Sequence, residues 1–266
     1  MQPILHQSQG ICPVCGEHSK FTSYTHWLRD DLRCENFHSI PRERAFAWCL
    51  NTFVPDWRSK VLHECSPVDR SISAVMKREA PRYIGTQYWP DRDPGRVYEG
   101  YRCENLEDLT FEDESIDLHV HMDVMEHVNS PHACFREMER TLRPGGKIIF
   151  TTPVFATKEK TERRASYTKD GVTHLFEPEY HGNPISDQGS LVTFHYGADL
   201  SDLILAWAPN CAVTMITPHR HDIGVRGDHR EVFLVEKPPT QGTASRKEKL
   251  WKSLKPSLVS RHLCRW

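Results

Sequence analysis

The middle of the chain alternates short apolar runs with amphipathic stretches, and this alternation limits the possible folds more than any other feature. The apolar runs have the length and composition of strands; they occupy residues 60–65, 82–86, 100–103, 116–122 and 147–152, with later runs at 212–217 and 231–236. Helical spacing falls between or beside them, at residues 41–51, 71–80, 131–142 and 197–207. Strands that alternate with helices are typical of βαβ units. The sequence therefore predicts an α/β fold: a Rossmann-like, mostly parallel sheet of seven strands with helices on both faces.

The length of the chain fits one main domain with additions. With 266 residues and 38% apolar content, the chain can bury one sizeable core. We expect an N-terminal knuckle over residues 1–40, the main domain over 41–238 and a basic tail over 239–266. Residues 154–196 show no clean period and are rich in His, Gly, Pro and Asp, so we predict an irregular lid on the substrate side.

Charge and hydropathy exclude several classes of protein. The formal net charge of −2 offers no global attraction to nucleic acid. No run approaches the roughly 20 apolar residues that a membrane span requires. The N-terminus has neither the basic flank nor the apolar run of a secretion signal, so a soluble, cytoplasmic protein is expected. From Arg246 onward the tail is basic with interleaved Trp and Leu; it is either a solvated tail or an amphipathic helix that contacts a membrane surface, a partner or RNA.

The nine cysteines are an odd number, so their spacing matters more than their count. Cys12 and Cys15 form a CxxC knuckle, and Cys34 and His38 complete the pattern C-x2-C-x18-C-x3-H. Thiolates and imidazole at this spacing suit tetrahedral zinc. His18 and His26 are alternative fourth ligands. The expected role is structural, because nothing in the sequence places the knuckle beside a catalytic pocket.

Three segments stand in order between residues 61 and 153: NLEDLTFEDESIDL, DVMEHV and FREMERTLRPGGKIIFTTP. Together they resemble the class I S-adenosylmethionine-dependent methyltransferases, especially the methyltransferase type 11 group. The knuckle, with Phe37 in place of a second cysteine and Ser39-Ile40-Pro41-Arg42 after it, is similar to the zinc ribbons that precede some of these enzymes. The resemblance implies S-adenosylmethionine as cofactor and methyl transfer as the reaction.

The resemblance also implies which residues hold the cofactor, since ligands of doubly wound sheets sit outside the carboxyl ends of the strands. Glu64 would accept from the ammonium group, Gln87 and Tyr88 stand at the ribose position, and Asn105 and Leu106 stand at the adenine. The remaining members of the implied set are Cys65, Ser66, Met122, Asp123 and His127; Met122 and Asp123 would line the pocket near the sulfonium, with His127 just behind. The first loop lacks glycine and Gln87 replaces an acid, so a cofactor-free binding module is one alternative.

Methyl transfer mainly requires alignment, and a base is needed only where the acceptor loses a proton. Four histidines are candidates for that base: His127, His174, His181 and His195. We predict His127 and His181 as catalytic, and Tyr180, His181 and His195 as substrate-binding, because segment 174–184 concentrates polar and aromatic groups. The leading hypothesis is a methyltransferase for a small-molecule or sugar acceptor; the main alternative is an RNA methyltransferase that uses the knuckle and the basic tail.

Overall fold

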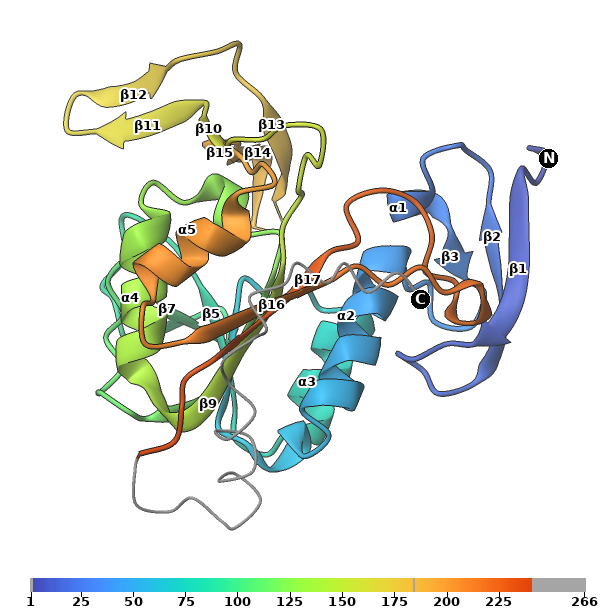
Figure 1. Cartoon of the computed structure of the whole chain (residues 1–266), viewed down its shortest axis with the longest axis horizontal. Helices are drawn as coiled ribbons and strands as arrows, with labels where there is room; N and C mark the ends of the chain where they lie inside the picture. Colours follow the sequence, from blue (N-terminus) through green and yellow to red (C-terminus); the bar gives the residue numbers. More distant parts are fainter. Residues whose placement is uncertain (1, 184, 241–266) are drawn as a thin grey trace, which may run out of the picture.

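The computed structural model describes residues 2–183 and 185–240, and they contain one eight-stranded mixed sheet (Figure 1). Its order is β16 (Ala212–Ile216), β17 (Val232–Glu236), β9 (Leu142–Thr151), β8 (Ile116–Met122), β4 (Leu62–Cys65), β5 (Tyr83–Gln87), β7 (Tyr101–Cys103) and β6 (Val97–Tyr98). The run from β9 to β7 is parallel throughout. The predicted α/β class is confirmed. The eighth strand is the two-residue β6, which pairs antiparallel with β7 and is too short to leave a period in the sequence.

Helices cover both faces of the sheet (Figure 1). α2 (Pro41–Phe53) and α3 (Ser71–Glu79) lie on one face, and α4 (Pro131–Thr141) and α5 (Leu200–Trp207) lie on the other. Alternate residues of β9 serve the two cores: Ile149 packs with the α2 and α3 side, whereas Ile148 and Phe150 pack with the α4 and α5 side. The predicted helices are confirmed, although α5 begins at Leu200 rather than at residue 197.

The sheet face beneath α4 carries buried histidines within otherwise apolar strands. His63 of β4 and His119 of β8 join through their Nδ1 atoms at 2.7 Å, and their Nε2 atoms contact the hydroxyls of Thr86 and Thr141. Burial lowers the pKa of His63 to about 3, so the ring is neutral near pH 7. This chain of polar contacts explains how imidazoles are accommodated in the core.

The N-terminal segment packs directly on the main domain. It contains β1 (His6–Ile11), β2 (His18–Ser23), α1 (Leu28–Asp31) and β3 (Arg33–Cys34). Its Cys12, Phe21 and Leu32 share one buried cluster with Leu50 and Leu62. The turn η3 (His221–Ile223) between β16 and β17 also lies against β1. The division at residue 40 stays a prediction, but the two parts have a continuous core.

The prediction that residues 154–196 are irregular is wrong. They form three antiparallel pairs: β10 (Glu162–Arg163) with β15 (Phe194–His195), β11 (Ala165–Thr168) with β12 (Gly171–His174), and β13 (Tyr180–Asn183) with β14 (Ser186–Leu191). The strands are short and mostly solvated, so no apolar alternation marks them in the sequence. This insertion projects beyond the end of α5 (Figure 1).

The basic tail from residue 241 onward lies outside the described residues. Among the residues that are described, no helix combines the length and the apolar character needed to cross a membrane.

Candidate active site

The chain turns sharply at the carboxyl ends of two adjacent strands. Ser66, just after β4, has φ +56°, and Asp123, just after β8, has φ +54°. Left-handed backbone is uncommon in residues other than glycine, and where it occurs it often marks a functional site. The loop after β4 therefore makes its tight turn without a glycine, and the backbone strain of the left-handed conformation falls on Ser66. Both turns open onto the edge of the sheet where ligands of this fold class bind.

Glu64, at the end of β4, lies inside the protein. Its carboxylate accepts hydrogen bonds from Ser73 Oγ at 2.5 Å and from the Tyr83 hydroxyl at 2.8 Å. Burial raises the pKa of Glu64 to about 7 despite these two donors. The side chain thus ties β4 to α3 and β5. Its expected contact with the cofactor's ammonium group stays a prediction.

The loop after β4 is held by Gln87 from the end of β5. Ser66 Oγ donates to Gln87 Oε1 at 3.3 Å, and Gln87 Nε2 donates to the carbonyl of Pro67 at 3.0 Å. Ser71, at the start of α3, has a buried hydroxyl that finds no hydrogen-bond partner in the described part of the chain. A free hydroxyl at a helix N-terminus, below a tight loop, suits the anionic end of a ligand.

The other implied cofactor residues lie farther along the same edge. Tyr88 follows β5 and is half-exposed. Asn105 accepts from the backbone N–H of Glu107 through Oδ1, at 3.0 Å, and Leu106 beside it is buried. Cys65 is partly buried next to the loop. The assignments of these residues to the cofactor stay predictions.

Asp123 is bound by two arginines of the N-terminal half. Arg29 of α1 donates to Asp123 Oδ2 at 2.5 Å, Arg42 Nε of α2 lies 3.2 Å away, and Thr151 Oγ1 donates to Oδ1 at 2.9 Å. Burial alone would raise the pKa of Asp123, but the two positive charges lower it to about 2. The N-terminal segment therefore reaches the end of β8, which the sequence did not indicate. The neighbouring Met122 packs against the core.

A second cluster of polar side chains surrounds Glu126, which belongs to the turn η2 (Met125–His127) after β8. Glu126 is buried, and its Oε2 accepts from Thr152 Oγ1 at 3.0 Å, whereas none of residues 2–183 and 185–240 offers Oε1 a hydrogen bond. His127 Nε2 and His181 Nδ1 lie 3.8 and 3.9 Å from that unpaired oxygen. Burial, with the nearby charge of Asp123, raises the pKa of Glu126 to about 8.

The insertion supplies the rest of this cluster. His127 Nδ1 contacts the carbonyl of Leu191 at 2.9 Å. Glu179 accepts from His181 Nε2 at 3.2 Å and from His195 Nε2 at 2.8 Å. Burial lowers the pKa of both His127 and His195. The structure thus brings together three of the four candidate histidines.

Two candidates are not members of this cluster. His174 is on the exposed hairpin β11–β12, and Tyr180, one position before His181, is exposed. The sequence analysis missed Glu126 and Glu179. Both were visible as acidic residues next to chosen histidines, Glu126 within DVMEHV and Glu179 two positions before His181.

The thiols of Cys12, Cys15 and Cys34 lie within 4.8 Å of one another. The contact between the two thiols lowers the pKa of Cys34 and, together with burial, raises the pKa of Cys12. Three convergent thiols suit zinc. His38 is not part of this group: it is exposed, and with φ +52° it takes the same left-handed position after its knuckle that Gly16 takes after the first. Among the described residues, three of the four predicted ligands are therefore grouped.

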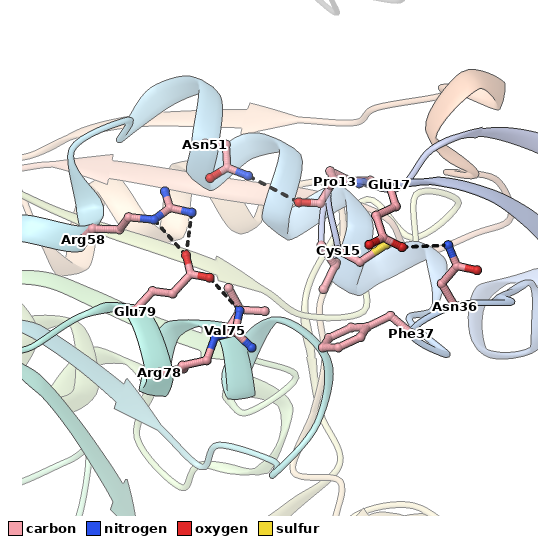
Figure 2. A pocket seen from close by; sticks show the side chains of 12 residues that line it. Pro13, Cys15, Glu17, Asn36, Phe37, Asn51, Arg58, Val75, Arg78 and Glu79 are labelled. Carbon is pink, nitrogen blue, oxygen red and sulfur yellow. Dashed lines mark hydrogen bonds and ion pairs between the residues drawn. The ribbon is translucent and has the colours of Figure 1, made fainter.

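A groove of about 480 Å³ separates the knuckle from α3. Figure 2 shows Cys15 and Phe37 on the knuckle side, and Arg58, Arg78 and Glu79 on the other. Glu79 accepts from Arg58 at 2.8 Å and from Arg78 at 2.6 Å. Because Arg58 precedes β4 and Glu79 ends α3, the groove lies at the amino ends of the strands, away from the clusters described above.

Comparison with known proteins finds one family match and several similar solved structures. Residues 71–150 match the family model described as a methyltransferase domain. An S-adenosylmethionine-dependent methyltransferase from Mesorhizobium loti is 14% identical, with 72% of this chain and 97% of that chain covered and a TM-score of 0.48. A putative one from Listeria monocytogenes is 12% identical, with 74% and 98% covered and a TM-score of 0.48. No curated protein sequence matches the chain significantly.

A third solved structure is 1,6-didemethyltoxoflavin-N1-methyltransferase from Burkholderia thailandensis, with bound 1,6-didemethyltoxoflavin and S-adenosylhomocysteine. It is 14% identical, with 74% of this chain and 78% of that chain covered and a TM-score of 0.45. The family match identifies residues 71–150, which span α3 to β9 of the mixed sheet, as a methyltransferase domain.

The residues present fit the cofactor at the loop after β4, where the unpartnered Ser71 hydroxyl and the left-handed turn at Ser66 leave polar groups for a ligand. When bound there, S-adenosylmethionine would supply a methyl group that its sulfonium activates. The chain's own contribution at this loop is positional, because Gln87 holds the loop through the Pro67 carbonyl.

Proposed function

We propose that this enzyme methylates a small-molecule or sugar-type acceptor, bound between the insertion and the carboxyl ends of β8 and β9. The observation that carries the proposal is the cluster of Glu126, His127, His181, Glu179 and His195, which joins the strand ends to the insertion. Imidazoles and carboxylates in one site suit an acceptor with several hydroxyl groups, because each side chain can donate or accept a hydrogen bond.

The exposed face of the insertion adds apolar contacts. Leu175, Phe176 and Tyr180 are all at least 45% exposed, although they are large and apolar or aromatic. Exposed aromatic side chains beside a polar cluster are typical of binding sites for small ligands. The shape of the insertion as short hairpins, rather than a broad basic surface, favours a compact acceptor over RNA.

Of the candidate bases, His181 is best placed to take a proton from the acceptor. Its side chain is 38% exposed, against 17% for His127. Glu179 accepts from Nε2 and sets the orientation of the ring, so Nδ1 is the nitrogen left for proton exchange. Glu126 lies next to that nitrogen.

Methyl transfer from labelled S-adenosylmethionine into sugars, nucleotide sugars, phenols and total RNA tests the proposal. We expect incorporation into a hydroxylated small molecule, and His181→Asn should lower kcat by about 10²- to 10⁴-fold without weakening cofactor binding. His174→Asn, on the exposed hairpin, is the matched control. Methylation of RNA alone, lost when residues 246–266 are deleted, would favour the RNA alternative.

A further inference from the structure

The space enclosed by Glu126, His127 and His181 has the composition of a metal site. Three potential ligand atoms, Glu126 Oε1, His127 Nε2 and His181 Nδ1, lie within 4.8 Å of one another. Their separations of 3.8 and 3.9 Å exceed a hydrogen bond, so the three atoms face a common point without contacting each other. Metal bonds of about 2.1 Å require ligand atoms about 3.0 to 3.5 Å apart, so the two pairs that include Glu126 Oε1 need to close by only about 0.5 Å.

The unpaired oxygen of Glu126 supports a metal site independently of the distances. The residue is 1% exposed, its other carboxylate oxygen is hydrogen-bonded to Thr152, and Oε1 has no partner among the described residues. A buried carboxylate oxygen without a donor is costly. A cation at the common point removes this cost, because it supplies the missing positive partner.

Both histidines are oriented as metal ligands are. His127 uses Nδ1 for the Leu191 carbonyl, which leaves the lone pair of Nε2 facing Glu126. His181 uses Nε2 for the Glu179 carboxylate, which leaves Nδ1 facing Glu126. A ligating histidine almost always donates its other N–H to a carbonyl or a carboxylate, and here one histidine does each. Glu179 also accepts a hydrogen bond from His195, and this contact fixes the position of the Glu179 carboxylate.

We infer that Glu126, His127 and His181 bind one divalent transition metal ion at the acceptor side of the methyltransferase site. Two imidazoles and one carboxylate select ions such as Zn²⁺, Fe²⁺, Co²⁺ or Mn²⁺ over Mg²⁺ and Ca²⁺, which prefer oxygen ligands. Three protein ligands leave coordination positions open, and these suit acceptor oxygens. A role of the ion in catalysis rests on the proposed function, and His181 then acts as a metal ligand instead of a base. Binding of the ion does not depend on the proposed function.

Titration with Mn²⁺, followed by the loss of its free electron paramagnetic resonance signal, tests the inference without cofactor or acceptor. Mn²⁺ is the probe because the Cys12 group, built of thiols, favours softer ions. We expect one bound ion per chain, lost in both Glu126→Gln and His181→Asn. Glu179→Gln should weaken binding by about 10- to 100-fold, since it removes only the orienting carboxylate. Two control variants should bind Mn²⁺ as the wild type does. They are Glu177→Gln, which changes an exposed glutamate two positions before Glu179, and Cys15→Ser.

Circular dichroism on each variant separates loss of binding from loss of fold, and the partly exposed His181 makes at least one ligand variant tolerable. No Mn²⁺ uptake by the folded wild type, or uptake unchanged in His181→Asn, would overturn the inference. Uptake that disappears in Cys15→Ser alone would overturn it as well, because the ion would then belong to the knuckle. Methyl transfer without any bound metal would leave the proposed function standing.

Discussion

The contact between Arg29 and Asp123 should be a measurable link between the N-terminal segment and the catalytic sheet. The pKa of Asp123 falls from 3.8 to about 2, and at about 1.4 kcal/mol for each factor of ten in acidity this amounts to about 2.5 kcal/mol. Arg42 and Arg29 share this stabilisation, so we expect a coupling free energy of about 1 to 2 kcal/mol for Arg29 alone. The Asp123 side chain is only 16% exposed, so solvent screening is limited.

A double-mutant cycle with Arg29→Met and Asp123→Asn, followed by urea unfolding, measures this coupling. The matched control is the cycle of Arg33→Met with Asp31→Asn, whose ion pair is 3.8 Å long and has an arginine that is 57% exposed. We expect less than about 0.5 kcal/mol of coupling there.

The same cycle should give equal values at pH 7 and pH 5. Asp123 has a lowered pKa in the folded state, so its contribution is complete above pH 3.8 and is lost only as the pH falls toward 2. Coupling in the Arg29 cycle no larger than in the Arg33 cycle would refute the reasoning.

Three further perturbations have defined outcomes. Gly224→Ala should lower Tm by clearly more than Gly16→Ala in calorimetry: both residues have positive φ, but an added Cβ at Gly224 would lie 2.5 Å from the Phe21 ring, whereas at Gly16 it meets open space. His121→Phe should stabilise the protein by about 1 to 2 kcal/mol in urea unfolding, because both ring nitrogens are buried and lack partners among the residues that the structure describes. Burial lowers the pKa of His121 to about 3, so only the unfolded chain takes up a proton below about pH 6.5, and the advantage of the variant should grow as the pH falls; a gain that is independent of pH would contradict this. Removal of metal by a chelator should lower Tm in the wild type, and Cys15→Ser should abolish the part of this effect that belongs to the knuckle.

The sequence alone was sufficient for the architecture, and three of the histidines it singled out lie together in the structure. Periodicity located α4 and the buried strands β8 and β17 to within a residue or two, because a fully buried strand must be a short apolar run and a helix that packs on one face must repeat near 3.6 residues. The segment DVMEHV begins directly after β8, as predicted. Once the strand is located, the residues that follow it must lie at its carboxyl end, where ligands of this fold class bind.

Only the tertiary structure decided the interactions between distant segments. The hairpins of the insertion have solvated strands, so no burial pattern announced them. The pairing of Arg29 with Asp123 spans 94 positions, and that of His181 with Glu126 spans 55, distances over which a sequence carries no local signal. His38 fits the ligand spacing of a zinc site but occupies a backbone position that leaves it exposed. Local pattern specifies elements, because neighbouring residues share one helix or strand; which side chains meet at a site depends on how those elements pack.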